Sequence, residues 1–170
     1  LAMGGTYYLT VTDSNGCVSD QASTSVTVNA KPTVNPTSNS PVCEGSTINL
    51  YGDAGMDSWS WSFSGGGWTS SLQNPTRSSA TPAMGGTYYL TVTKDGCTSD
   101  QASTSVTVNA KPTANPTSNS PVCEGSTINL YGDSGMASWS WTGPNSFSSS
   151  VQNPSIPSAT TAMSGTYYLT

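Results

Sequence analysis

The chain has 170 residues, a formal net charge of −5 and no histidine, and only 8% of its residues are charged. This balance excludes a nucleic-acid partner, because binding a phosphate backbone needs a basic surface. The absence of histidine excludes a Ser-His-Asp triad and a Cys2His2 zinc site, and the abundance of uncharged polar residues is typical of an exported surface protein.

The chain is built from a repeated segment, because residues 19–61 return at 99–141 with nearly every residue the same. The thirteen residues QASTSVTVNAKPT occur unchanged at positions 21–33 and 101–113. A fixed period of about 80 residues is the size of one small domain and indicates a tandem array. Near-identical copies favour length, multivalency or assembly over a single active site.

Three segments follow from this period. Residues 1–31 are predicted to be the C-terminal part of a preceding repeat, residues 32–111 a complete repeat, and residues 112–170 the N-terminal part of a following repeat. The sequence GTYYLT occurs at both 5–10 and 165–170, so the chain starts and stops inside the same element. We expect a piece of a longer array; the alternative is a subunit whose end domains are completed by neighbouring copies.

Strands are predicted throughout the complete repeat, because short alternating runs are bounded by Gly, Pro, Asn and Asp. A first strand ends at residues 42–45, and the later ones are expected, in chain order, at 47–51, 58–63, 68–72, 77–83, 87–93 and 99–109. The segment 94–96 between the last two is a hairpin turn. With no helix signal, this pattern predicts an all-β fold of tandem immunoglobulin-like sandwiches.

Aromatic residues of these strands are candidates for the core and for contacts with partners. Trp61 and its counterpart Trp141 are predicted to lie in the core. Trp59 and Trp139 share their face, and the sequence leaves two interpretations open for them: core residues, or a platform that stacks on sugar rings. Tyr89 is expected to face outward and to contact another domain or subunit.

A tyrosine recurs at the start of one predicted strand in all three segments. Tyr7, Tyr88 and Tyr167 each stand two residues after a glycine. This is the place of a tyrosine corner, in which the hydroxyl group bonds back to the main chain a few residues upstream. We therefore predict a structural role for these three residues.

The repeat resembles the PKD-like and immunoglobulin-like repeats of large secreted bacterial surface proteins, notably adhesins and gliding-motility proteins. The resemblance is carried by CEGSTINL, SWSWTGPNSFSSSVQNPSI, GTYYLTVT and the DSNGC turn. SWSWSFSGGG at residues 58–67 is similar to the signature strand of PKD domains, with Trp61 and Phe63 at its aromatic positions and without its acidic residue. The resemblance implies a β-sandwich that serves as a spacer, stalk or adhesive module outside the cell.

The four cysteines are of two kinds, one of each kind per repeat. Cys43 and Cys123 lie in PVCEGSTINL, and Cys17 and Cys97 lie in turns. We predict a disulfide between Cys43 and Cys97, with Cys17 and Cys123 paired to adjacent repeats or chains. An immunoglobulin topology, however, places the first turn and the last hairpin at opposite ends, so that Cys43 would reach a neighbouring domain's hairpin more easily.

We therefore expect a structural protein that forms an extracellular rod, stalk or filament, assembled head-to-tail by strand complementation. Its expected partners are copies of itself and surface glycans; the sequence contains no apolar run that would span a membrane, and we expect no cofactor, metal or enzymatic activity. The alternative is a carbohydrate-binding accessory module of a secreted polysaccharide-degrading enzyme. That alternative predicts an exposed stripe of aromatic residues.

Overall fold

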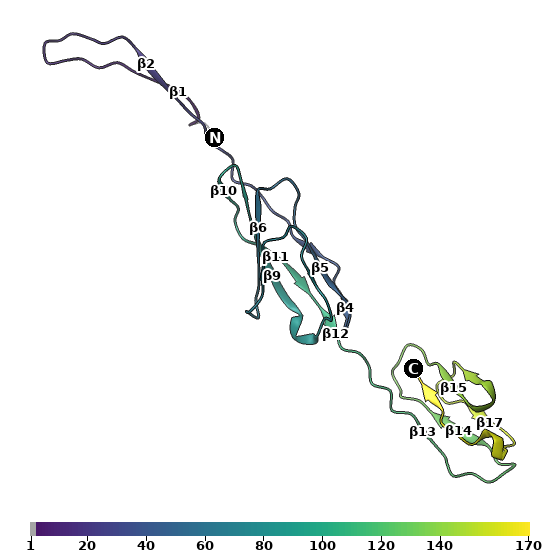
Figure 1. The fold of residues 1–170 in the computed structure, drawn as a ribbon. Coiled ribbons are helices and arrows are strands. Elements are labelled where there is room, and N and C mark those ends of the chain that lie inside the picture. The colour runs from purple at the N-terminus through teal and green to yellow at the C-terminus, as the bar shows by residue number, and fades with distance from the viewer. Residues whose placement is uncertain (1–2) are drawn as a thin grey trace. The chain divides into compact units, whose positions relative to one another are not determined.

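A computed structural model describes residues 3–170, and these residues are all-β apart from three short 3-10 turns (Figure 1). The chain divides into two compact units, Leu1–Lys111 and Pro112–Thr170, which are described separately below. No helix in the described part of the chain is long and apolar enough to cross a membrane.

The first unit begins with a two-stranded hairpin. Strands β1 (Gly5–Leu9) and β2 (Ala22–Val26) pair antiparallel, and every residue of both strands is exposed. In the connecting loop, the Asp13 carboxylate accepts hydrogen bonds from the backbone N–H groups of Cys17 (2.8 Å) and Asn15 (2.9 Å). These two donors hold the pKa of Asp13 below its ordinary value. Two strands alone bury little, so such a hairpin is marginally stable by itself.

The rest of the first unit is a sandwich of two antiparallel sheets. The larger sheet has the order β10-β9-β6-β7, and β11 also pairs with β9. The smaller sheet has the order β3-β5-β8, and β4 and β12 form a separate parallel pair. The bounds are β3 (Thr37–Ser38), β4 (Val42–Cys43), β5 (Ile48–Tyr51), β6 (Ser58–Phe63), β7 (Thr69–Ser70), β8 (Thr76–Arg77), β9 (Gly86–Lys94), β10 (Cys97–Thr98), β11 (Ala102–Val106) and β12 (Val108–Asn109).

This strand distribution is that of an immunoglobulin-like sandwich and confirms the predicted fold class. The β9–β10 connection contains Asp95 and Gly96, whose φ angles are 50° and 77°. Positive φ at both central residues is the geometry of the tight turns that match the twist of paired strands. The predicted hairpin turn is therefore present, and both of its central residues have the backbone conformation that such a turn requires.

The core of this sandwich lies between the two sheets. Alternation places Tyr88, Leu90 and Val92 of β9 inside, together with Ile48 and Leu50 of β5. Successive side chains of a strand point to opposite faces, so one run of β9 contributes three core residues. Trp61 of β6 and Val106 of β11 complete the contact between the sheets.

Two predicted strands differ from the observed ones. Of residues 77–83, only Arg77 pairs in a strand, and Pro82–Met84 form the 3-10 turn η1. Ser79 has a φ of 53°, which interrupts the extended backbone soon after Arg77 and explains the early end. The predicted strand 99–109 divides into β11 and β12, because after Val106 the chain leaves β9 and the carbonyl of Thr107 accepts the N–H of Val42 at 3.0 Å.

The second unit repeats the first part of this sandwich. One sheet has the order β13-β14-β17 and the other β16-β15-β18. The bounds are β13 (Thr117–Ser118), β14 (Ile128–Tyr131), β15 (Trp141–Gly143), β16 (Phe147–Ser149), β17 (Ser155–Ile156) and β18 (Tyr168–Leu169), with 3-10 turns η2 (Pro144–Ser146) and η3 (Thr161–Met163). The described strands of this unit include none in the places of β10, β11 and β12.

Candidate functional site

No group of three or more His, Cys, Asp or Glu side chains gathers anywhere in residues 3–170. The candidate functional features are therefore the aromatic residues, the cysteines and the exposed apolar surfaces within each unit. Each of these can be compared between copies, because the copies carry nearly the same residues.

Trp61 and Trp141 occupy equivalent core positions in the two units. Each indole is only 1% exposed. The indole N–H of Trp61 donates to the carbonyl oxygen of Gln73 (3.3 Å), and that of Trp141 donates to Gln152 (3.2 Å). A buried Trp needs such a partner for its N–H, so both residues are core residues with a satisfied polar group.

Trp59 and Trp139 are both half-buried, and Trp59 packs against the core of the first sandwich. Their indole N–H groups donate to the carbonyl oxygens of Asp53 (3.0 Å) and Asp133 (2.9 Å). None of the five tryptophans is exposed, so they do not form the aromatic stripe that the carbohydrate-binding alternative predicts. Tyr89 is half-buried in β9, with Ser62 and Ser103 opposite it on the neighbouring strands.

The predicted tyrosine-corner residues have the same geometry in all three copies. The hydroxyl of Tyr88 donates to the Met84 carbonyl at 2.9 Å, and that of Tyr167 donates to Met163 at 3.0 Å. Tyr7 makes the same bond to Met3 at 2.6 Å, although its side chain is exposed in the hairpin. The local sequence is thus sufficient for this bond, whether or not a sandwich covers the ring.

Arg77 packs over aromatic side chains of the first sandwich. The guanidinium carbon of Arg77 lies 5.3 Å from the ring centres of Phe63 and Trp68, and its Nη1 donates to the Tyr88 hydroxyl at 2.6 Å. A cation over aromatic faces is attracted by their quadrupoles. In the second unit Ile156 takes this place, so the arginine is a feature of the first unit.

Replacing Tyr88 with Phe is expected to destabilise the first sandwich by about 1–3 kcal/mol, because the Met84 carbonyl loses its part-buried hydrogen bond and the Arg77 guanidinium loses its hydrogen bond to the hydroxyl. Urea unfolding followed by tryptophan fluorescence measures the change. The Tyr89→Phe variant, with the same chemical change on the half-exposed face, is the control. Equal effects of the two substitutions would contradict a structural role for the Tyr88 hydroxyl.

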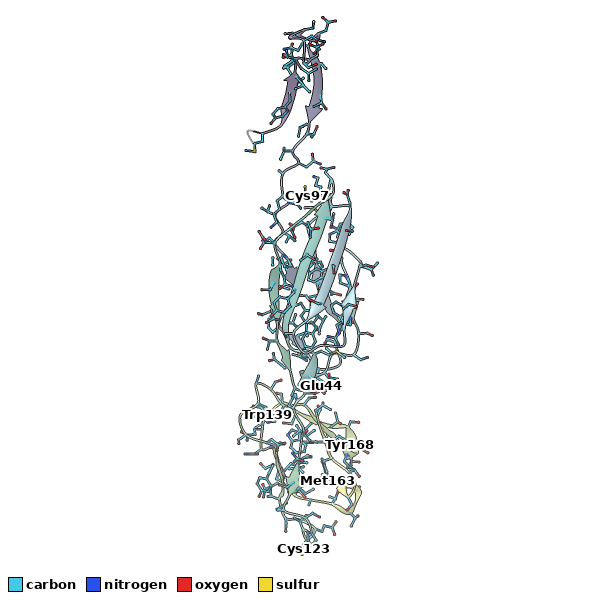
Figure 2. All side chains as sticks on the ribbon, turned by 90° about the vertical axis from the view of Figure 1, so that its left-hand side faces the viewer. Glu44, Cys97, Cys123, Trp139, Met163 and Tyr168 are labelled. Carbon is cyan, nitrogen blue, oxygen red and sulfur yellow. The ribbon has the colours of Figure 1, made fainter. Side chains whose placement is uncertain are left out.

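The predicted Cys43–Cys97 disulfide is not formed, and all four cysteines are free thiols. Glu44, next to Cys43, and Cys97 lie at opposite ends of the first sandwich (Figure 2). A disulfide needs Cα atoms about 4.4–6.8 Å apart, so this arrangement does not allow a bridge within the domain. The pairing of Cys17 and Cys123 with other repeats stays a prediction.

Each cysteine of the first sandwich lies beside a chain segment that connects repeats. Cys43 stands opposite Asn109 in the parallel β4–β12 pair. At the other end, the Cys97 thiol lies 3.7 Å from the Asn29 carbonyl oxygen, to which it donates. Asn29 and Asn109 occupy the same position in the two copies of QASTSVTVN. Both kinds of cysteine are therefore associated with the same position of the repeat.

The second unit carries a groove of about 280 Å³. It is lined by residues of the first strands, of η3 and of the segment after it, including Ser118, Pro121, Ile128, Leu130, Met163 and Tyr167. The counterparts of Ile128 and Tyr167 in the first unit, Ile48 and Tyr88, are fully buried. Here both are half-buried, so the groove exposes part of a core that is covered in the first unit.

The hairpin shows the reverse situation. Its side chains Tyr7, Leu9 and Val26 are 51%, 63% and 43% exposed. Their counterparts in the first sandwich, Tyr88, Leu90 and Val106, are at most 3% exposed. The hairpin is thus a copy of β9 and β11 without the sheets on which they pack. The groove and the hairpin are thus the two places where side chains that are buried in the first sandwich are exposed.

Comparisons with known proteins identify no family: neither a protein-family model nor a curated protein matches the chain. Among solved structures, it is similar to three N-terminal domains of the highly immunogenic outer capsid protein of bacteriophage RB49, at 18% identity and a TM-score of 0.43, covering 90% of this chain and 60% of that one. It is also similar to a chain from the complex of a mouse coronavirus receptor-binding domain with its murine receptor. This match has 15% identity and a TM-score of 0.40, and it covers 81% of this chain and 90% of that one.

A third similar structure contains the eight N-terminal Ig domains of Down Syndrome Cell Adhesion Molecule, at 15% identity and a TM-score of 0.38, covering 82% of this chain and 22% of that one. These likenesses concern the fold alone. The strand order of the first unit and the repetition of the sequence define the chain as a protein of tandem immunoglobulin-like β-sandwiches.

Proposed function

We propose that the chain is a structural protein outside the cell, in which tandem sandwiches form a rod, stalk or filament. This is the role of the PKD-like repeats of bacterial surface proteins that its sequence resembles. The observation that supports it is the path of the chain through the first sandwich. The connecting segments make contacts at opposite ends of this domain, so tension on the chain passes through the whole sandwich.

Contacts hold each connecting segment at its end of the sandwich. At the first end, the side-chain amide of Asn29 donates to the Asp95 carbonyl at 2.8 Å, and Lys31 forms an ion pair with Asp100. At the other end, the N–H of Lys111 donates to the Glu44 carboxylate at 3.1 Å. These contacts support a connection stiffer than a free tether.

The parallel β4–β12 pair is the element that resists tension in this proposal. The N–H of Val42 donates to Thr107 at 3.0 Å, and the N–H of Glu44 donates to Asn109 at 2.8 Å. Because the two strands are parallel and come from the beginning and the end of the first sandwich, pulling slides one past the other. Their hydrogen bonds are then loaded together instead of breaking one at a time.

The proposal includes neither a cofactor nor an enzymatic activity, and the partners are further copies of the chain and surface glycans. An extracellular location is supported by the low content of charged residues. Four free cysteines at equivalent places suit an oxidising compartment, in which they can link repeats.

Stretching single molecules tests the proposed role. The first sandwich is expected to resist tension and then to unfold in one step, releasing residues 37–109, whose extended length is roughly 250 Å at about 3.4 Å per residue. Glu44→Pro removes one N–H of the parallel pair and is expected to raise the unfolding rate at a given force roughly fivefold, which corresponds to about 1 kcal/mol.

The substitution is compatible with the local turn. Ser46 donates its N–H to the Cys43 carbonyl, and Gly45 has a φ of 85°, so residue 44 holds the turn position that favours proline. Glu44→Gln separates the loss of the carboxylate from the loss of the N–H. Glu124→Pro, at the equivalent place of the second unit, is the matched control. Extension without measurable resistance would contradict the proposed role.

A further inference from the structure

We propose that successive repeats of this protein are joined by a disulfide bond at their junction. The cysteine of the Cys43 type in one repeat pairs with the cysteine of the Cys97 type in the next repeat. Cys123 is of the first type, and Cys17 is of the second. The inference deepens the proposed structural function and rests on it, and it adds a covalent modification whose two sulfur atoms are named.

One carbonyl group locates both cysteines of a junction. In the first sandwich, the Asn109 carbonyl accepts the N–H of Glu44, the residue after Cys43, at 2.8 Å. The carbonyl oxygen of Asn29, at the same position of the preceding copy, lies 3.7 Å from the Cys97 sulfur. Both asparagines end the nine identical residues QASTSVTVN. Because a carbonyl oxygen can accept two hydrogen bonds, one asparagine can receive both partners.

The pairing of strands places Cys43 itself beside this asparagine. Cys43 stands opposite Asn109 in the parallel β4–β12 pair, and paired strands lie about 4.8 Å apart. Within one sandwich, by contrast, Glu44 and Cys97 lie at opposite ends (Figure 2). A disulfide needs Cα atoms about 4.4–6.8 Å apart. The junction is therefore the place where cysteines of the two types come close enough to bond.

The connecting segment is attached to the repeats on both of its sides. At the start of the first sandwich, the Lys31 ammonium group forms an ion pair with Asp100. At the end of this sandwich, the N–H of the equivalent Lys111 donates to the Glu44 carboxylate at 3.1 Å. In an array, each such lysine makes both contacts, one with the repeat before it and one with the repeat after it. This double attachment holds the two thiols at the same asparagine.

Both thiols are accessible to an oxidant, because Cys43 is exposed and Cys97 is half-buried. One thiol loses its proton, and the thiolate attacks a small-molecule disulfide such as oxidised glutathione, which releases one glutathione thiolate. The second protein thiolate then attacks the mixed disulfide and releases the other glutathione. Two protein thiols are thus oxidised to one disulfide, and one small-molecule disulfide is reduced to two thiols.

Such a bridge changes how far tension can extend the first sandwich. A bond from the preceding repeat to Cys97 places residues 37–96 inside a covalently closed loop, so that only residues 98–109 of the sandwich lie between the bridge and the next connection. Their extended length is roughly 40 Å at about 3.4 Å per residue, instead of roughly 250 Å for the whole sandwich. A bridged array therefore extends little, as a rod or stalk requires.

The test uses the full chain with a copy of residues 36–81 added before its first residue. Residues 2–10 are identical to residues 83–91, so the added copy continues into the chain in register and completes the preceding repeat. The copy carries one cysteine of the Cys43 type. Cys17→Ser, Cys43→Ser and Cys123→Ser then leave this added cysteine and Cys97 as the only thiols.

Oxidised glutathione is added, and the unreduced peptides are mapped by mass spectrometry. A bridge between the added cysteine and Cys97 is expected within most monomers, with a yield that does not depend on protein concentration. Monomers without a bridge, or links formed only between chains, would overturn the proposal. Stretching the oxidised form should show the short step of the first sandwich and the reduced form the long one; an unchanged step would also overturn the proposal.

The matched control keeps Cys43 and replaces the added cysteine with serine. The two remaining thiols then have the same neighbours in the sequence but belong to one repeat. The yield of the bridge within monomers should be at least tenfold lower than across the junction. Equal yields would show that the thiols meet without the geometry of the junction, and the proposal would fail.

An insertion separates a fixed junction from chance collision of two thiols. Gly-Ser-Gly-Ser between Ala30 and Lys31 lengthens the connecting segment and should slow formation of the bridge at least fivefold, because the asparagine and the lysine no longer hold the two repeats together. Thiols that meet by chance on a flexible connection would react about equally fast with and without the insertion. That result would overturn the proposal.

This outcome is separate from the stretching of the reduced chain, which tests the resistance of one sandwich. Resistance to tension without a bridge would remove this inference and keep the proposed function. A bridge in a chain that extends without resistance would remove the mechanical role and keep the modification.

Discussion

Trp61→Ala is expected to lower the free energy of unfolding of the first sandwich by about 3–5 kcal/mol. The indole is 1% exposed, belongs to the core cluster to which β5 and β9 also contribute, and donates its N–H to the Gln73 carbonyl. Truncation leaves a large cavity in this cluster. Because small domains are stable by only about 5–15 kcal/mol in total, the loss is a large fraction of the stability of this sandwich.

Urea unfolding followed by near-ultraviolet circular dichroism measures this effect. The matched variant is Trp141→Ala, at the equivalent position of the second unit, where the surrounding residues are less buried. It should leave the transition of the first sandwich in place. A Trp61→Ala protein that unfolds at the urea concentration of the unmodified chain would contradict the assignment of this tryptophan as the centre of the core.

Local patterns were sufficient for the strands that form the core. The run 58–63 is both the predicted and the observed strand, and β9 extends its predicted bounds by one residue at each end. In both strands, alternate residues point to opposite faces, and one face is more buried than the other. The tyrosine at the start of β9 is equally local, because its hydrogen bond partner lies four residues upstream.

Features that depend on the topology could not be predicted from local sequence patterns. Nothing in residues 99–109 marks the point after Val106 at which the chain leaves β9 and joins β4. That change depends on a pairing with a segment more than sixty residues away. The role of Arg77 is similarly non-local, because its aromatic neighbours come from three other parts of the domain.

The cysteines show the same limit. One cysteine of each kind per repeat suggested a bridge within the repeat, because counting residues does not reveal distance. In the sandwich, Cys43 belongs to the end from which the chain leaves, and Cys97 to the end at which it arrives. A disulfide between neighbouring repeats also uses one cysteine of each kind per repeat, and it is the arrangement that the topology favours.

Burial itself is a property of what surrounds a segment. The nine residues QASTSVTVN are buried on one face at 101–109 and exposed on both at 21–29. The same nine residues therefore contribute differently to stability at their two positions in the chain. A substitution at equivalent positions should change the free energy of unfolding of the first sandwich in one copy and not in the other.

Val106→Asp is expected to unfold the first sandwich, with a loss of about 3–5 kcal/mol, because it places an unpaired carboxylate in the apolar core. Val26→Asp changes the same residue in the same local sequence, but the side chain is exposed. It should leave the unfolding of the first sandwich unchanged. Hydrogen exchange of β9 amides measures both variants: Val106→Asp should abolish their protection, and Val26→Asp should preserve it. Similar protection in the two variants would show that burial in the sandwich does not distinguish these copies, and the assignment of Val106 to the core would then fail.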